Sequence, residues 1–406
     1  MAVDYDPGLP QVIADPYPVL RQLQAEDPVH WSGRLGGWVL TGYADVKAAL
    51  SDPRMSADRI TPFLESQSGG GQPEVRELCR QVGMWTVFTD PPAHSRLRGL
   101  MNQAFTSRAV IRLRPRIQEI VDDLIDRVQD QGRMDVIRDY AYPLPVTVIA
   151  EMLGVPAEDR ERLKSWSDEL ALFIGSALAT PDKYERAGRS ILEMREYFHR
   201  LVAARRTRPQ GDVMSVLIAA GERGEALTEE ELVASCIMLL FAGHETTTNL
   251  IGNGVLALLR NKDQLELLRE DLSLAPSAVE ELLRYDGPTQ AMVRIAAEDL
   301  EILGRRIERG NRIFAMINAA NRDPLQFRDP DRLDIRREKN PHLAFGYGVH
   351  FCLGAPLARL EAQIAIPALL RRLPELGLLT DSLEWLNSLV FRGMKSLPVS
   401  FRPPAS

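Results

Sequence analysis

Cysteine is scarce in this chain: its 406 residues include only Cys79, Cys236 and Cys352. Three widely spaced cysteines are too few for the disulfide framework of a small secreted protein, and they fit a reducing compartment better. The first ten residues also lack an apolar core and carry acidic side chains. We therefore expect a cytoplasmic protein with neither a signal peptide nor a membrane anchor.

An excess of positive charge is missing as well. The 49 Lys and Arg residues are outnumbered by 56 Asp and Glu residues, so the net charge of −7 gives no indication of nucleic-acid binding. Hydrophobic residues make up 45% of the chain and charged residues 26%. These proportions are ordinary for a globular protein that can bury a wide core and a cofactor. Length alone would suggest two or three domains.

The most informative stretch runs from Phe345 to Glu361, with the sequence FGYGVHFCLGAPLARLE. Its first ten residues, 345–354, are called the cysteine loop below. Two early glycines let its backbone lie close against a flat group, and Cys352 comes just before a helical pattern that begins at Ala355. Free N–H groups and the helix dipole favour a thiolate there. A single thiolate without a CxxC partner or a histidine pair is a poor zinc site, but it suits haem iron, which needs one strong axial ligand.

The cysteine loop resembles the haem-ligand signature of the cytochrome P-450 family, Phe-Gly-x-Gly-x-His-x-Cys-x-Gly. Every fixed position is present: Phe345, Gly346, Gly348, His350, Cys352 and Gly354. A lone cysteine is usually a buried core residue, but a chance match to this pattern has a probability of about 10⁻⁹ per window. The resemblance implies that haem b lies against Phe345, Gly346, His350, Cys352 and Gly354, with Cys352 as the axial ligand of the iron.

The resemblance covers nearly the whole chain and implies its fold. That fold is mainly α with a small β portion: a triangular helical prism with a long central helix, and minor β-sheets around a buried haem. We expect one catalytic domain over residues 1–406, with its β-rich parts mainly at 28–42, 290–310 and 387–402. Residues 59–86 are predicted to be an irregular segment over the distal haem face. Predicted helices at 159–178 and 183–206 would form a lid, and we expect a monomer.

A long helix is predicted from Thr228, which carries a capping signal, to Leu259. Residues 243–249 interrupt its apolar run with polar side chains, so the helix is not a membrane span. A buried helix with a polar centre needs an explanation. Hydrogen bonding between helices by threonine and asparagine is one, and a reactive site is the other.

The segment Ala242-Gly243-x-Glu245-Thr246 within this helix resembles the oxygen-activation motif of the P-450 family. The resemblance implies that the small Ala242 and Gly243 let the haem face and dioxygen approach the helix backbone. Thr246 and Glu245 would then be the catalytic residues, because a hydroxyl and a carboxyl can relay protons from solvent.

Two basic residues near residue 95 are candidate partners for the cofactor. His94 and Arg98 are four residues apart and share a helix face, where a solvated pair would be the commoner role. The resemblance assigns both to the haem propionates, together with Arg294 and His350. Two carboxylates that enter a low-dielectric core need cationic or N–H donors.

Glu281 and Arg284 form an i,i+3 pair, which alone is a common surface feature. Their place between the long helix and the cysteine loop resembles the buried Glu–Arg pair of the P-450 family. We therefore expect a structural pair that supports the cysteine loop.

Residues 91–118 contain six arginines and no acidic residue, although the chain is acidic overall. This basic run is either a solvated face or a docking patch for an acidic redox partner. Since Cys352 lies only 54 residues before Ser406, we expect no appended flavin or iron–sulfur domain. Electrons would then come from NAD(P)H through a separate reductase and a ferredoxin or flavodoxin.

The resemblance also implies the reaction: one oxygen atom of O2 is inserted into an unactivated C–H bond, as a hydroxylation or an epoxidation. The expected substrate pocket comprises Met84, Phe88, Leu240, Ala242, Val293, Val390 and Phe391. These residues are mostly apolar and favour a hydrophobic natural product such as a macrolide, terpenoid, steroid or fatty acid. One alternative is a haem-thiolate peroxygenase or isomerase, which needs no proton relay. Another is a non-catalytic haem sensor or binding protein.

Overall fold

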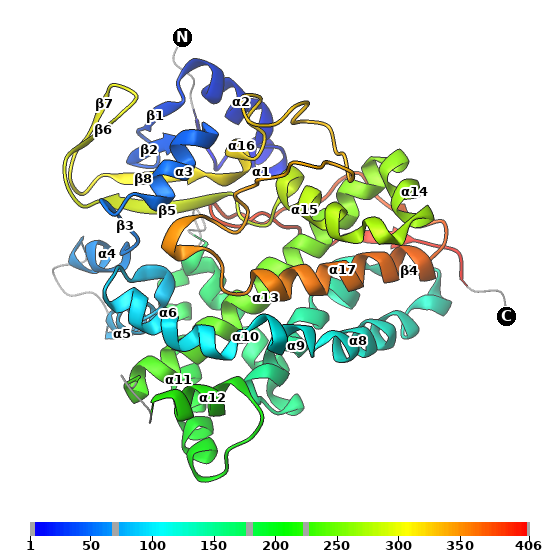
Figure 1. Ribbon diagram of the computed structural model, residues 1–406, viewed down its shortest axis with the longest axis horizontal. Coiled ribbons are helices and arrows are strands. Elements are labelled where there is room, and N and C mark those ends of the chain that lie inside the picture. The colour runs from blue at the N-terminus through cyan, green and yellow to red at the C-terminus, as the bar shows by residue number, and fades with distance from the viewer. Residues whose placement is uncertain (1–4, 67–72, 176–181, 222–226, 404–406) are drawn as a thin grey trace.

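The computed structural model describes residues 5–66, 73–175, 182–221 and 227–403 (Figure 1). The predicted extension of the first lid helix to residue 178 lies outside these ranges. None of the described helices is both long and apolar enough to cross a membrane.

Helix α13 (Glu229–Arg260) is the central element of the structure and passes through the middle of the molecule (Figure 1). Its 32 residues span about 48 Å. Thr228 and Glu231 form a reciprocal capping box at its start, as the sequence predicts. It packs against α9 (Pro143–Leu153), α11 (Lys183–Thr207), α15 (Ala275–Asp286) and α17 (Ala355–Arg372).

The other helices surround this axis. In the N-terminal half they are α1 (Pro10–Ala14), α2 (Tyr17–Glu26), α3 (Tyr43–Ser51), α4 (Ile60–Ser66), α5 (Pro73–Val82), α6 (Ala93–Ala104), α7 (Ser107–Ile111), α8 (Arg114–Asp126) and α10 (Arg160–Ile174). Later in the chain are α12 (Val213–Gly221), α14 (Lys262–Glu270) and α16 (Ile317–Ala320). A π-helical turn at Ile137–Ala141 precedes α9.

The prediction of an irregular segment over residues 59–86 is wrong, because α4 and α5 lie within it. Helix α5 buries Val75, Leu78, Cys79 and Val82, which recur at the three- and four-residue spacing of one helix face. It packs that face against α11. The charged residues between these positions hide the short apolar stripe from a reading of the sequence.

The main sheet and a separate hairpin lie at the upper left of Figure 1, whereas β4 lies at the right of the molecule. In the described part of the chain the main sheet has the order β1 (Val29–Ser32), β2 (Gly37–Leu40), β8 (Arg312–Met316), β5 (Ala291–Ala296), β3 (Met55–Ser56). Only β2 and β8 are parallel; the other neighbours in it are antiparallel. Smaller sheets contain β4 (Arg133–Asp135), β10 (Pro398–Ser400) and β9 (Gly377–Leu378), and the hairpin of β6 (Leu300–Ile302) and β7 (Arg305–Ile307).

The predicted β-rich parts at 28–42 and 290–310 contain strands as expected. The part at 387–402 contains only the short β10 and isolated bridges, one of which joins Phe391 to Thr289. This loop is held beside β5 by side-chain hydrogen bonds from Gln290 to the carbonyl oxygens of Ser388 and Phe391.

A fully buried ion pair on α15 holds the segment that leads into the cysteine loop. Arg284 Nε and Nη2 donate to the Glu281 carboxylate at 2.8 and 2.7 Å, and both side chains are 0% exposed. The remaining donors and acceptors of the pair bind the segment 321–340. Arg284 donates to the carbonyl oxygens of Asn321, Pro330 and Arg332, and Glu281 accepts from Asp334 N, Arg337 and Asn340.

Removal of one partner of this pair should destabilise the protein strongly, because the other charge stays buried. We expect Arg284→Ala to lower the free energy of unfolding by about 3 to 5 kcal/mol. Arg200→Ala removes an exposed i,i+4 ion pair with Glu196 and should cost less than about 1 kcal/mol. Denaturant unfolding of both variants measures the difference, and equal losses would contradict the structural role of the pair.

Candidate active site

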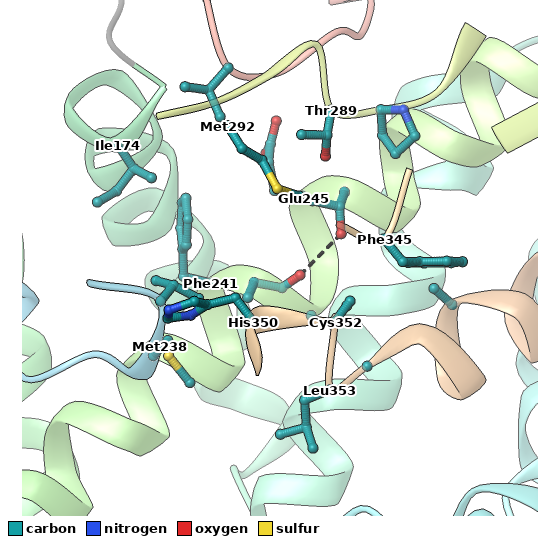
Figure 2. Close-up of a pocket in the computed structure, with 18 of the residues that line it drawn as sticks. Ile174, Met238, Phe241, Glu245, Thr289, Met292, Phe345, His350, Cys352 and Leu353 are labelled. Atoms are coloured by element: carbon teal, nitrogen blue, oxygen red, sulfur yellow. Dashed lines mark hydrogen bonds between the residues drawn. The ribbon is translucent and has the colours of Figure 1, made fainter. Parts of the chain in front are cut away.

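A cavity of about 290 Å³ lies between α13, the cysteine loop, β5 and the loop after residue 387. Figure 2 shows Cys352, His350, Met238, Phe241 and Glu245 around it. Most of its lining is apolar. Glu245 is the only carboxyl-bearing residue among the described residues that line it.

The cysteine loop is shaped by its glycines. Gly346 and Gly348 adopt φ angles of +71° and +72°, in the left-handed region that residues with a Cβ rarely occupy. A Cβ at Gly348 would also lie 3.1 Å from the carbonyl oxygen of Leu50. Cys352 N donates to the Phe345 carbonyl at 2.9 Å, which closes the loop and places the thiol just before α17.

Neighbouring groups shift the pKa of the Cys352 thiol in opposite directions. Burial raises its pKa, while hydrogen bonds from the backbone N–H groups of Gly354 and Ala355 and the charges of Arg98 and Arg359 lower it, and the net shift is upward. Among the described residues no cluster of three or more His, Cys, Asp and Glu side chains could hold a metal ion. Cys352 is therefore placed to act as a single ligand.

The opposite wall is the polar centre of α13. Ala242, Gly243 and Thr246 line the cavity, and Thr246 Oγ1 donates to the Ala242 carbonyl at 3.2 Å. Gly243 has a second reason to be glycine. A Cβ there would lie 2.8 Å from Cγ1 of Ile149, so the small residue also permits the close packing of α13 on α9.

Glu245 is buried beside Thr246. Asn249 Nδ2 donates to Glu245 Oε1 at 3.1 Å. Burial raises the pKa of Glu245, although His244 and the hydrogen bond from Asn249 oppose this shift. The carboxyl group therefore keeps its proton to higher pH than an exposed glutamate, and it can donate that proton within the cavity.

Two arginines and a histidine gather at the edge of the cavity beside the cysteine loop. Arg98, Arg294 and His350 line the cavity, and Arg98 Nη2 donates to the Phe351 carbonyl at 2.7 Å. Arg294 is 6% exposed and donates to the Val293 carbonyl, but no carboxylate of the described residues forms an ion pair with it. Burial lowers its pKa to about 10.

The two histidines of this cluster stack on each other. The ring centroids of His94 and His350 are 4.3 Å apart, and His94 Nδ1 is buried without a hydrogen-bond partner among the described residues. Burial, followed by the charges of Arg294 and His94, lowers the pKa of His350 to about 3. His94 does not line the cavity itself. Its ring instead packs against that of His350, which does line the cavity. The cluster as a whole can bind carboxylates.

Five of the seven predicted pocket residues line the cavity: Phe88, Ala242, Val293, Val390 and Phe391. Met84 and Leu240 do not, and these two predictions are wrong. Leu240 is two residues from Ala242, about 200° around the helix, and it faces a separate small cavity with His244. Met84 packs against the neighbouring hydrophobic cluster, and the cavity lining in this segment starts one residue later, at Trp85.

The sequence also places residues 288–293 along the pocket, and Thr289 and Met292 of that range line the cavity. Four other lining residues were missed: Ala57, Arg59, Ile174 and Met238. Met238 could have been found, because it lies one helical turn before Ala242. The other three come from the segment between β3 and α4 and from the end of α10, whose approach to the cavity depends on tertiary structure.

Comparison with known proteins identifies the family to which the chain belongs. The family model described as Cytochrome P450 matches residues 39–374. The chain belongs to the cytochrome P450 family. This confirms the predicted family, and the fold is the cytochrome P450 fold.

The relatives agree over nearly their full length. Cytochrome P450 monooxygenase PikC from Streptomyces venezuelae is 42% identical over 401 residues, which cover 96% of this chain and 92% of that protein. Vitamin D(3) 25-hydroxylase from Pseudonocardia autotrophica is 42% identical over 395 residues, 96% of this chain and 94% of that one. This protein is accordingly a cytochrome P450 monooxygenase.

A solved structure has the same fold. P450BioI, in complex with acyl carrier protein ligated to hexadec-9Z-enoic acid, superposes with a TM-score of 0.90 at 40% identity. The match covers 97% of this chain and 99% of that one. The cytochrome P450 family implies haem iron and O2 as the chemistry for which the cavity is built.

The raised pKa of Glu245 predicts a pH-dependent infrared signal. A protonated carboxyl band assigned to Glu245 should persist above the ordinary pKa of a glutamate, near 4.3, and should be missing from Glu245→Gln. A carboxyl whose pKa is raised in the folded state stabilises the protein at pH values below its unfolded-state pKa. This stabilisation is lost as pH rises through the folded-state pKa. The melting temperature of the wild type should therefore fall relative to that of Glu245→Gln as pH rises. Parallel pH profiles of the melting temperature in the wild type and in Glu245→Gln would contradict this prediction.

Proposed function

We propose that this cytochrome P450 inserts one oxygen atom of O2 into a C–H bond of an apolar small molecule, with electrons supplied by a separate protein. The observation that carries the proposal is the cavity itself. It is largely apolar, Cys352 forms one wall, and Thr246 and Glu245 meet it from α13.

The residues around the cavity fit haem b. Cys352 supplies one sulfur ligand at the start of α17, and the glycines of the cysteine loop leave room for a flat group. Arg98, Arg294 and His350 would hold the two propionates, with His94 positioning His350. The positive charges of Arg98 and Arg294 lack carboxylate partners among the described residues, and two carboxylates would compensate them. The histidines would contribute ring N–H donors.

When bound, the haem supplies the oxygen and one-electron chemistry, and the protein supplies protons, exclusion of water and substrate position. Burial raises the pKa of Glu245, so this carboxyl group keeps its proton to a higher pH than an exposed glutamate would. The Thr246 hydroxyl now donates to the Ala242 carbonyl, so its oxygen can accept a hydrogen bond from a donor in the cavity. This acid and alcohol pair favours a reaction that consumes protons over a peroxide-driven reaction, an isomerisation or haem sensing.

An exposed basic surface beside the cysteine loop supports a separate electron donor. Of the six arginines in residues 91–118, Arg96 pairs with Glu231 and Arg116 with Glu151. Three others are exposed and form no ion pair with described residues: Arg108, Arg112 and Arg114. Exposed apolar side chains lie on the same segment at Ile111 (64%) and in the cysteine loop at Val349 (57%) and Phe351 (42%), whose carbonyl accepts from Arg98. We assign this surface to an acidic ferredoxin or flavodoxin that receives electrons from an NAD(P)H reductase.

The first test concerns the ligand. Ferrous Cys352→Ser, mixed with carbon monoxide, should lose the absorption band of a thiolate-ligated haem. Cys79→Ser should keep that band, because Cys79 is buried in α5 away from the cavity. Survival of the thiolate band in Cys352→Ser would refute the central assignment.

The second test concerns proton delivery. Thr246→Ala should retain haem but lose product formation by at least about tenfold, while peroxide release takes up the reducing equivalents. Thr248→Ala is the matched control, because Thr248 is buried on α13 and does not line the cavity. Unchanged coupling of electrons to product in Thr246→Ala would remove this hydroxyl from the proton path.

A further inference from the structure

One cation in the cavity lies apart from the cluster assigned to the propionates. Arg59 follows β3 and precedes α4, and it lines the cavity. Its guanidinium carbon lies 4.7 Å from the centre of the Phe88 ring. Nη2 donates to the carbonyl oxygen of Ile174, the last residue of α10, at 3.0 Å.

This guanidinium has more donors than partners. Arginine carries five N–H groups, and no carboxylate of the described residues forms an ion pair with Arg59. Burial, followed by the charges of Arg294 and Arg312, lowers its pKa to about 10. A buried charge that is repelled by its neighbours is costly unless an anion compensates it.

Two acidic residues adjoin this segment, Asp58 in the sequence and Asp90 through its contacts with Ser56 and Ala57, and both already accept hydrogen bonds. Asp58 Oδ1 accepts from the backbone N–H groups of Ile60 and Thr61 at the start of α4. Asp90 accepts from Ser56 Oγ and Ala57 N, and its charge acts on Arg294 and the histidine pair. The anion that would satisfy Arg59 must therefore come from a molecule in the cavity.

The surroundings of Arg59 define that molecule. Phe88 and Ile174 flank the guanidinium with apolar surface, and the same cavity continues past Met238 and Val293 to Cys352. A ligand with a negative end at Arg59 would thus place an apolar body along α13, toward the sulfur.

We propose that Arg59 binds the carboxylate of an apolar carboxylic acid substrate and so fixes which end of the substrate faces Cys352. This inference rests on the proposed monooxygenase function and narrows its substrate class. The planar guanidinium can bind a carboxylate through two parallel hydrogen bonds, a geometry that an ester or alcohol cannot match. Oxidation would then occur at a carbon remote from the carboxylate.

The test compares acids with their neutral esters in the haem-loaded protein. Decanoic, dodecanoic, tetradecanoic and hexadecanoic acids, the resin acid abietic acid, and the methyl esters of all five are titrated at neutral pH. The shift from low-spin to high-spin iron and equilibrium dialysis report binding. At least one acid should bind more tightly than its ester. Arg59→Gln should raise the Kd of that acid by about 10- to 100-fold and leave the Kd of the ester nearly unchanged, and Arg59→Lys should recover part of the loss.

Arg312→Gln is the matched control. It removes a neighbouring positive charge, but Arg312 is exposed and does not line the cavity, so the preference for acid over ester should persist. Equal binding of acids and esters by the wild type, no acid-specific binding in the series, or an unchanged preference in Arg59→Gln would overturn the inference. So would faster loss of haem from Arg59→Gln, because Arg59 would then belong to the propionate anchors. In each case an intact thiolate-type spectrum with carbon monoxide and oxidation of a neutral apolar compound would leave the proposed monooxygenase function standing.

Discussion

The buried pair of Glu281 and Arg284 is the interaction on which the geometry of the site depends. It satisfies three carbonyl oxygens of an otherwise irregular segment, including that of Asn321. The Asn321 side chain in turn accepts from the backbone N–H of Leu343, two residues before the cysteine loop. A chain of hydrogen bonds therefore connects α15, which packs on α13, to the loop that carries Cys352. The two facing walls of the cavity are held in register by polar contacts that are shielded from water.

Charge is distributed unevenly around that cavity. Arginines and a histidine face it from the side of the cysteine loop and from the segment before α4, while Glu245 alone provides a carboxyl among the described lining residues. Unpaired positive charge in a partly buried cavity is costly, and anionic groups of a bound molecule would offset that cost. The lowered pKa values of Arg294 and His350 are the local expression of this imbalance.

The sequence predicts the chemistry of the site better than its shape. Cys352, Glu245 and Thr246 lie in local patterns, in which a loop or one turn of helix sets the position of each side chain. Leu240 was assigned to the wrong face because the phase of α13 relative to the cavity is fixed by its packing on other helices. Arg59 could not be recognised, since a lone arginine before a short helix is usually solvated. Its role depends on Phe88 and on the end of α10, which only the tertiary fold brings beside it.

The end of α10 joins segments that lie outside the cysteine loop and α13. The carbonyl of Ile174 accepts from Arg59, and that of Gly175 accepts from the Ser388 hydroxyl and from the backbone N–H of Leu389. Segments from three distant parts of the sequence thus meet at one helix terminus beside the cavity, and none of them belongs to the cysteine loop or to α13. A substitution in any of these segments changes the shape and charge of the substrate end while the thiol, Glu245 and Thr246 keep their positions. Selectivity can therefore vary while the oxidative residues stay in place, and the role proposed for Arg59 is one such determinant of selectivity.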